Sequence, residues 1–236
     1  MVLYFTYKVK NNMLSLAKEK LIKSLHTKKG RLNADLCLVE SKKVIETAGN
    51  AVEFTFTDSD TEIFDDLITT ETPQNIAGVA KIPKWNLDDI KKYPTIVVLD
   101  GVQDPGNVGS IFRLCLGFNA SLILIESVDP TSPKVIRSSV GTLFQIPWLN
   151  IKRSEAEKLF QDLGRPIYRL EKRSSEILDN KLIKKMNGNI IIIVGSEGQG
   201  IKIDTKGTSI EIKHNEKLES LNVGHALAIL LNSRQK

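Results

Sequence analysis

Three short segments in the second half of the chain are almost continuously apolar, and they limit the possible fold more than any other feature. They read TIVVLD (95–100), SLILI (121–125) and NIIIIV (189–194), and segments with helical spacing separate them. Strands that are apolar on both faces need cover on both faces, which is typical of a parallel sheet with crossover helices. We therefore predict a doubly covered α/β sheet that binds ligands at the carboxyl ends of its strands.

The first 80 residues predict a smaller α/β unit in front of this sheet. Pro83, Pro94 and the charged residues between them are typical of a linker at 81–93, so we expect one domain at 1–80 and a second at 94–236. The elements expected in the first domain are a helix over 11–26, a loop at 26–31, strands at 34–39 and 51–56, and helices at 41–48 and 59–68.

Positive charge is concentrated at the amino-terminal end of the chain. The whole chain has 33 Lys and Arg against 28 Asp and Glu, a net charge of +5, whereas residues 1–43 alone have 10 against 3. A basic segment attracts a polyanion such as nucleic acid. We predict that Lys28, Lys29 and Arg31, in the expected loop, contact that polyanion. The alternative is a solvated, lysine-rich helix face.

Sequence signals for membranes, secretion and metals are absent. No apolar run approaches the roughly 20 residues that cross a bilayer, and the amino terminus has no apolar core with a cleavage site. Cys37 and Cys115 lack the spacing of a zinc site or a disulfide framework. We expect a soluble, cytoplasmic protein that holds no structural metal.

A strip of small and polar residues follows the first apolar strand, in DGVQDPGNVGSIFR (100–113). On a helix from about residue 108, Gly109, Ser110 and Arg113 share one face. Small residues let a ligand come close, and arginine offers a planar fork of donors that suits phosphate. The alternative is a glycine-rich helix contact beside a surface arginine. The apolar face should hold Val108, Ile111, Phe112, Cys115 and Leu116.

Two further polar clusters follow later apolar segments. IIIIVGSEGQG (190–200) places glycines and the carboxylate of Glu197 at the end of a strand, and LESLNVGHALAILL (218–231) places Ser220 and Asn222 before an apolar helix. Helix capping is the alternative role of the latter two. We expect His225 to be packed inside that helix rather than catalytic. The lack of GxGxxG argues against a dinucleotide-dependent dehydrogenase.

The three clusters together resemble a known family. NVGSIFR, VGSEGQG and SLNV, in this order, resemble the three signature motifs of the SpoU family of RNA ribose 2'-O-methyltransferases, part of the SPOUT superfamily. Residues 129–147 resemble a further stretch of that family, and residues 29–48 resemble its small substrate-binding domain. The resemblance covers nearly the whole chain from about residue 11. It implies a homodimer with a carboxy-terminal trefoil knot that binds S-adenosyl-L-methionine and acts on RNA.

The resemblance also implies roles for single residues. Arg113 matches the catalytic arginine. Because a guanidinium pKa above about 12 makes a neutral arginine costly, we expect Arg113 to clamp the RNA phosphate and ribose rather than to act as the base. The implied companions are Asn107, Glu197, Ser220 and Asn222, the implied cofactor contacts are Gly195, Ile212 and Leu221, and Arg137 joins Lys28, Lys29 and Arg31 as an expected RNA contact.

The substrate and one departure from the family leave alternatives open. An added amino-terminal domain is more typical of members that act on large-subunit ribosomal RNA, so we favour that substrate over transfer RNA. After Ile212 the chain has Lys213, His214 and Asn215, where members usually have an apolar residue, Pro and Met. This change motivates a second hypothesis, a ribosome-associated RNA-binding protein that no longer methylates.

Overall fold

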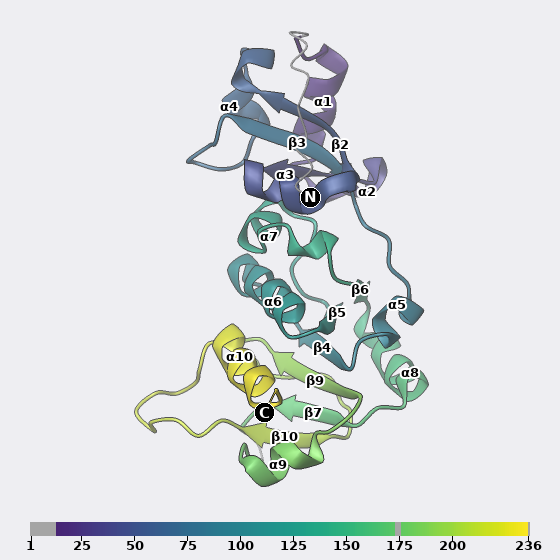
Figure 1. Cartoon of the computed structure of the whole chain (residues 1–236), viewed down its shortest axis with the longest axis vertical. Helices are drawn as coiled ribbons and strands as arrows, with labels where there is room; N and C mark the ends of the chain where they lie inside the picture. Colours follow the sequence, from purple (N-terminus) through teal and green to yellow (C-terminus); the bar gives the residue numbers. More distant parts are fainter. Residues whose placement is uncertain (1–12, 173–175, 236) are drawn as a thin grey trace, which may run out of the picture.

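Two β-sheets organise the chain in the computed structural model, which describes residues 13–172 and 176–235 (Figure 1). Within these residues the strands are β1 (Leu36–Glu40), β2 (Val52–Thr57), β3 (Ile76–Lys81), β4 (Thr95–Asp100), β5 (Ala120–Ile125), β6 (Trp148–Ile151), β7 (Ile167–Leu170), β8 (Glu176–Ile177), β9 (Ile190–Gly195) and β10 (Thr208–Glu211). The smaller sheet has the order β1-β3-β2 with antiparallel pairs. The larger has the order β6-β5-β4-β9-β7-β10-β8 with parallel pairs.

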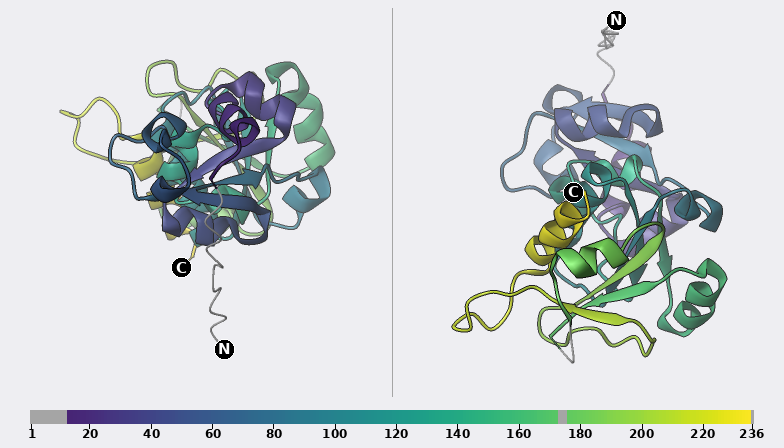
Figure 2. Two further views of the ribbon diagram at one scale, coloured as in Figure 1. Left: turned by 90° about the horizontal axis from the view of Figure 1, so that it is seen from above. Right: turned by 60° about the horizontal axis from the view of Figure 1, so that its bottom comes forward.

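Helices cover both faces of the parallel sheet, as its apolar strands predict. In the described part of the chain the α-helices are α1 (Leu16–Ser24), α2 (Lys28–Ala34), α3 (Lys42–Ala48), α4 (Phe64–Leu67), α5 (Leu87–Lys91), α6 (Pro105–Gly117), α7 (Pro133–Ser138), α8 (Arg153–Leu163), α9 (Asn180–Lys185) and α10 (Val223–Ser233). Ile96 and Val98 of β4 pack towards α5 and α8. Val97 and Leu99 pack on the other side, with α6, α7, α9 and α10. Figure 2 shows α8 and α10 on opposite sides of the sheet.

Helix α7 lies between the two sheets and joins them (Figure 1). Cys37 and Val39 of β1 belong to the same buried cluster as Val97 of β4, so the apolar core continues from one sheet to the other. Gly141, just after α7, has φ of +78°, and a Cβ there would lie 3.1 Å from Thr47 Cβ, at the end of α3. The small sheet is therefore packed directly on the helical layer of the large one.

The prediction of a loop at residues 26–31 is wrong, because residues 28–31 belong to helix α2. The Thr27 side chain caps this helix by accepting a hydrogen bond of 3.0 Å from the Gly30 backbone N–H. A Cβ on Gly30 would lie 1.9 Å from the Ser24 carbonyl oxygen, so glycine is needed where α2 folds against the end of α1. Arg31 is consequently a helical residue, and its side chain is only 4% exposed.

Two further differences concern the small sheet. The sequence predicts only two strands in the first domain, yet a third, β3, is the central strand of the small sheet, and its Gly78 packs under the Phe54 carbonyl oxygen. The helix expected over 59–68 is shorter: a 3-10 turn at Asp58–Asp60 precedes α4, and the Asp60 carboxylate accepts the Thr57 backbone N–H at 2.7 Å.

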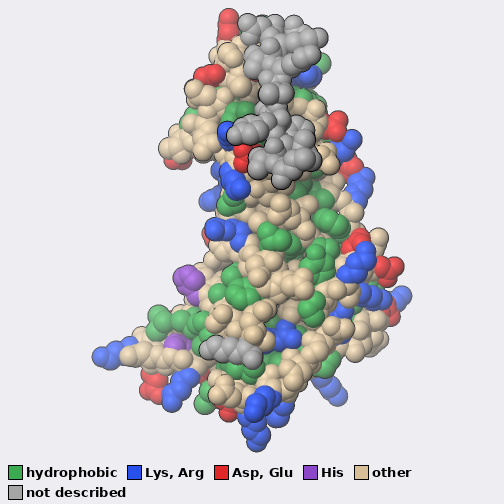
Figure 3. Space-filling view, viewed as in Figure 1, with side chains coloured by type: hydrophobic (Ala, Val, Ile, Leu, Met, Phe, Trp, Pro, Cys, Tyr) green, Lys and Arg blue, Asp and Glu red, His purple; other side chains and the backbone are tan. Residues whose placement is uncertain are grey.

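Large apolar side chains are exposed on one face of the molecule. Leu116 of α6 and Ile229 of α10 are each 42% exposed, so Leu116 differs from the other apolar residues of its helix face, which are buried. Figure 3 shows hydrophobic side chains across the middle of this face, in the region of these two helices.

Within the described residues, no helix combines the length and apolar character needed to cross a bilayer. Burial raises the pKa of the Cys37 thiol to about 12 and also raises that of Cys115.

Candidate functional site

Helix α6 begins directly after strand β4 and presents its polar strip at the carboxyl end of the sheet. The Asp104 side chain caps the helix by accepting the Asn107 backbone N–H at 2.7 Å, and Pro105 opens the first turn. Ser110 and Arg113 are exposed, as the helical spacing predicts. Gly109 is buried instead, because a Cβ there would lie 2.0 Å from the Ser138 hydroxyl of α7. Arg113 has neither an ion pair nor a hydrogen bond with any described residue, so its guanidinium is available to a ligand.

Three predicted site residues meet beside this helix. Asn107 Nδ2 donates to Glu197 Oε1 at 2.8 Å, and Asn222 Nδ2 donates to the same oxygen at 3.0 Å and to Asn107 Oδ1 at 2.9 Å. These residues come from α6, from the loop after β9 and from the start of α10. The three polar clusters, up to 115 positions apart in the chain, therefore form one constellation.

Asn222 has both of the roles that the sequence left open. Its Oδ1 accepts the backbone N–H groups of Gly224 and His225 at 3.0 and 3.3 Å, which makes it the N-cap of α10, while its Nδ2 binds Asn107 and Glu197. A side chain with both an acceptor and a donor end is needed for this geometry. His225 is exposed, so the expectation that it packs inside the helix is wrong.

The loop after β9 folds back tightly on the end of its strand. A Cβ on Gly195 would lie 2.1 Å from the Gly200 carbonyl carbon, and the Gly200 N–H donates to the Ser196 carbonyl at 2.9 Å. Asp100, at the end of β4, holds the next part of the loop by accepting the backbone N–H groups of Lys202 and Ile203 at 2.5 and 2.7 Å.

Asp100 is a site-shaping residue that the sequence analysis missed. Its side chain is fully buried and also accepts a hydrogen bond from Arg153 of α8. Burial alone would lower the pKa of Arg153, but its hydrogen bonds to Asp100 and Glu126 outweigh burial and raise that pKa. The only sequence signal for this role is a carboxylate at the carboxyl end of an apolar strand, where ligands and loops of parallel sheets gather.

A pocket of about 130 Å³ lies next to the constellation and contains the predicted cofactor residues Ile212 and Leu221. Ser220 lines this pocket and does not join the hydrogen bonds of Asn107, Glu197 and Asn222. Gly195 is not among the lining residues; it shapes the adjacent loop instead. The remaining walls are formed by Leu170, Glu171, Lys172, Ile210, Glu211, His214 and Ala226.

Comparison with known proteins now assigns the family. Residues 94–232 match the SpoU rRNA Methylase family. The chain belongs to this family. It is 28% identical, over 89% of its length and 92% of the relative, to the 23S rRNA (guanosine(2553)-2'-O)-methyltransferase RlmP of Bacillus subtilis. It is 31% identical, over 74% of its length and 67% of the relative, to the 23S rRNA (adenosine(1067)-2'-O)-methyltransferase of Streptomyces azureus.

Solved structures confirm the predicted SPOUT-type α/β fold class. The AdoMet-bound rRNA methyltransferase from Sinorhizobium meliloti matches with a TM-score of 0.80, at 21% identity, over 95% of this chain and 97% of that one. The SpoU methyltransferase AviRb from Streptomyces viridochromogenes matches with a TM-score of 0.76, at 20% identity, over 92% and 96%. The trefoil knot that the family resemblance implies stays a prediction.

The pocket fits the cofactor of a SpoU methyltransferase. Nδ1 of His214 lies 2.7 Å from the Ile212 carbonyl oxygen, and the other ring nitrogen, Nε2, is buried without a partner among the described residues. Buried polar atoms are normally hydrogen-bonded, so an orphaned one in a pocket wall indicates a missing ligand. Apolar walls with a few polar groups suit a nucleoside. No group of three or more His, Cys, Asp and Glu in the described residues is arranged to hold a metal.

The basic residues predicted to contact RNA fall into two groups. Lys28 and Lys29 are exposed on α2. Arg31 is not free to reach a ligand: it donates to Asp129 Oδ2 at 2.5 Å, to Thr131 Oγ1 at 3.2 Å and to two backbone carbonyls, so its predicted RNA role is withdrawn.

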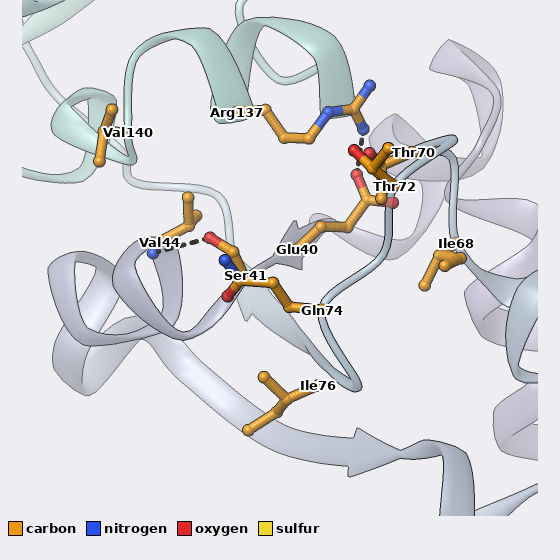
Figure 4. A pocket seen from close by; sticks show the side chains of 10 residues that line it. All are labelled: Glu40, Ser41, Val44, Ile68, Thr70, Thr72, Gln74, Ile76, Arg137 and Val140. Carbon is orange, nitrogen blue, oxygen red and sulfur yellow. Dashed lines mark hydrogen bonds and ion pairs between the residues drawn. The ribbon is translucent and has the colours of Figure 1, made fainter.

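Arg137 also takes part in the packing of the two sheets. Arg137 points from α7 to the buried carboxylate of Glu40 in β1 (Figure 4). It also donates to the Thr69 hydroxyl at 2.6 Å. Glu40 and Arg137 line a pocket of about 190 Å³ between α7 and the small sheet. The Arg137 side chain is 28% exposed, so it keeps some access to solvent while it is paired.

Proposed function

We propose that this SpoU methyltransferase transfers a methyl group from S-adenosylmethionine to the ribose 2'-hydroxyl of one nucleotide in large-subunit ribosomal RNA. The observation that carries the proposal is the constellation of Asn107, Glu197 and Asn222, together with Arg113 on the same helix as Asn107, exposed and without a partner among the described residues. A family member that had lost its chemistry would have no need to keep a solvent-facing site hydrogen-bonded across three segments. The relatives from Bacillus and Streptomyces, which are named as 23S rRNA 2'-O-methyltransferases, support the substrate class.

The chain supplies alignment for this reaction. S-adenosylmethionine, when bound, supplies an electrophilic methyl group on a sulfonium. Holding a nucleophile in line with its target can lower the activation barrier by roughly 7 to 11 kcal/mol. Arg113, exposed on α6, suits bidentate contact with a phosphate through its planar fork of donors. Arg113 therefore orients the RNA, and the proton of the 2'-hydroxyl must go to another group.

Glu197 is the acceptor that the constellation offers to that hydroxyl. Both amide groups of Asn107 and Asn222 donate to Oε1 of Glu197, which leaves Oε2 for a ligand. A carboxylate oxygen held by two amides has a fixed direction, and such positioning is what in-line displacement requires. Asn107 and Asn222 are thus positioning residues for Glu197.

The proposal includes a homodimer and the domain layout. Leu116 and Ile229 are exposed on α6 and α10, and Gly224 of α10 approaches Ser110 of α6, with 3.9 Å between a Gly224 Cβ and the Ser110 Cβ. Apolar side chains on such a surface are typical of subunit contacts (Figure 3).

The proposed domain layout is an RNA-binding domain at 1–80, a linker at 81–93 and a knotted methyltransferase domain at 94–236. An enzyme for ribosomal RNA would work in the cytoplasm.

The test is methyl transfer from labelled S-adenosylmethionine to purified RNA. We expect incorporation into large-subunit ribosomal RNA and resistance of the product to alkaline cleavage at one nucleotide, because a methylated 2'-hydroxyl cannot attack its phosphate. Transfer RNA serves as the competing substrate, and methylation of transfer RNA alone would reverse the substrate assignment. Binding of ribosomal RNA with no incorporation into either RNA would favour the non-catalytic hypothesis.

A further inference from the structure

We propose that Nε2 of His214 accepts a hydrogen bond from the exocyclic amine of the cofactor's adenine, so that this side chain selects an aminopurine. The proposal rests on the proposed function, because it places S-adenosylmethionine in the pocket that contains Ile212 and Leu221. His214 lies in the segment where the chain departs from the family motif, so the motif itself assigns it no role.

The hydrogen bonding of the ring shows which nitrogen is the acceptor. The Ile212 carbonyl oxygen, 2.7 Å from Nδ1, can only accept, so Nδ1 carries a hydrogen. In a neutral imidazole the other nitrogen then has a free lone pair. Nε2 of His214 is buried and has no hydrogen-bond partner among the described residues. His214, a residue of the pocket wall, therefore has an acceptor nitrogen that no described residue uses.

The local backbone turns His214 towards the pocket and its neighbours away from it. Lys213 and Asn215 are exposed, whereas His214 is half-buried. The Asn215 side chain accepts the Lys217 N–H at 3.0 Å, and the Asn215 carbonyl accepts the Leu218 N–H at 3.0 Å. This turn holds the backbone after His214, and the hydrogen bond between Nδ1 and the Ile212 carbonyl holds its ring before any ligand binds.

The surroundings of His214 favour the adenine amine over the other donors of the cofactor. Half of the residues that line the pocket are apolar, and an apolar wall suits the heterocycle of the cofactor better than its charged ammonium group. A planar heterocycle suits the apolar part of the wall, and its exocyclic amine is the donor that it brings there. That apolar part is formed by Leu170, Ile210, Ile212, Leu221 and Ala226.

The experiment compares two ligands in calorimetric titrations of the full chain. S-adenosylhomocysteine carries the amine, and S-inosylhomocysteine carries a carbonyl at the same ring position. The His214→Asn variant keeps an amide that can donate to the Ile212 carbonyl but removes the Nε2 position. We expect the wild type to prefer the adenine compound by about tenfold or more, equivalent to about 1.4 kcal/mol. In His214→Asn, this preference should disappear through weaker binding of the adenine compound.

Two further variants make the result specific. His214→Gln can place an amide oxygen near the Nε2 position and should retain part of the preference. Lys217→Ala, in the same exposed segment, should bind both ligands as the wild type does. Melting temperatures of the free variants, if close to that of the wild type, show that the fold is intact; if His214→Asn is unstable, His214→Gln and His214→Phe supply the comparison.

The outcomes are distinct. An unchanged preference in His214→Asn overturns the proposal, and so does an equal loss of affinity for both ligands, because His214 would then contact a group that the two compounds share. If the wild type binds neither ligand, the cofactor assignment of the proposed function fails first. If it binds both but shows no preference, only the role of His214 fails.

Discussion

Arg31 and Asp129 stand 98 positions apart in the chain, and their side chains form an ion pair of 2.5 Å that is almost closed to solvent. Arg31 belongs to α2 of the small domain, and Asp129 lies just before α7. Thr131 receives a further hydrogen bond from Arg31 and donates its own hydroxyl to Asp129 at 2.8 Å. This network fixes the small domain on the helix that packs against α6, the helix that carries Arg113.

Removing one member of this pair should destabilise the protein strongly. Arg31→Met leaves the Asp129 carboxylate buried without its partner, and we expect the free energy of unfolding to fall by about 3 kcal/mol. Lys29→Met is the matched control, because Lys29 is exposed on the same helix and should change the free energy by less than about 0.5 kcal/mol. Urea titration followed by circular dichroism measures both. Equal effects of the two substitutions would contradict the structural role of Arg31.

The same pair should make stability depend on pH in the acid range. Burial alone would raise the pKa of Asp129, but hydrogen bonds from Arg31 and Thr131 outweigh burial and lower that pKa. A carboxyl with a lowered pKa in the folded state stabilises the protein above its unfolded pKa, and this contribution is lost as pH falls through the folded pKa.

We therefore expect the difference in unfolding free energy between the wild type and Asp129→Asn to be constant above about pH 5 and to shrink below about pH 4. Urea titrations at five pH values provide the measurement. A difference that stayed the same down to pH 2 would show that Asp129 is not the titrating group.

Arg113→Ala should abolish methyl transfer while cofactor binding stays unchanged. The guanidinium is exposed on α6 and does not line the pocket that contains Ile212 and Leu221, so its loss should affect RNA alignment. Loss of one preorganised donor typically lowers kcat about 100-fold or more. Arg113→Lys keeps the charge without the bidentate fork and should be intermediate. Single-turnover assays at saturating RNA check the rate, and substantial turnover by Arg113→Ala would remove this residue from the mechanism.

Two glycines of one loop offer a matched pair of substitutions. A Cβ on Gly195 would lie 2.1 Å from backbone of Gly200, whereas a Cβ on Gly198 would meet nothing within 4 Å. Gly195→Ala should therefore displace the loop that carries Glu197 and weaken S-adenosylhomocysteine binding by about tenfold or more. Gly198→Ala should bind as the wild type does. Calorimetry on both variants decides, and equal affinities would place the cofactor away from this loop.

The site was more predictable from sequence than the packing around it. Three site residues, Asn107, Glu197 and Asn222, lie close to the ends of apolar strands and helices. The order of the three motifs along the sequence was therefore sufficient to identify them. Arg31 shows the opposite case. Its position beside Lys28 and Lys29 looks like a basic surface, and only tertiary contact with Asp129, in the other domain, shows that it is buried. Gly30 suggested a loop for the same reason. A glycine is needed at this position because the Ser24 carbonyl leaves no room for a Cβ, and not because the chain forms a loop.

The RNA-binding role of the small domain now depends on Lys28 and Lys29 rather than on three residues. Both are exposed on α2, and no described residue forms an ion pair or hydrogen bond with either side chain. Each lysine that contacts a phosphate releases counterions, so the logarithm of RNA affinity should fall with the logarithm of salt by about 0.7 per contact for single-stranded RNA.

Replacing Lys28 and Lys29 together by alanine should reduce that slope by about 1.4 and raise the KM for RNA, while cofactor affinity stays unchanged. Lys181→Ala with Lys184→Ala, two exposed positions on α9, is the control for a simple loss of two charges. Filter binding at five salt concentrations gives the slopes. If the α2 variant kept the wild-type slope, or if the α9 variant flattened it equally, α2 would not be an RNA-binding surface, because a local contact must depend on where the charges lie and not only on their number.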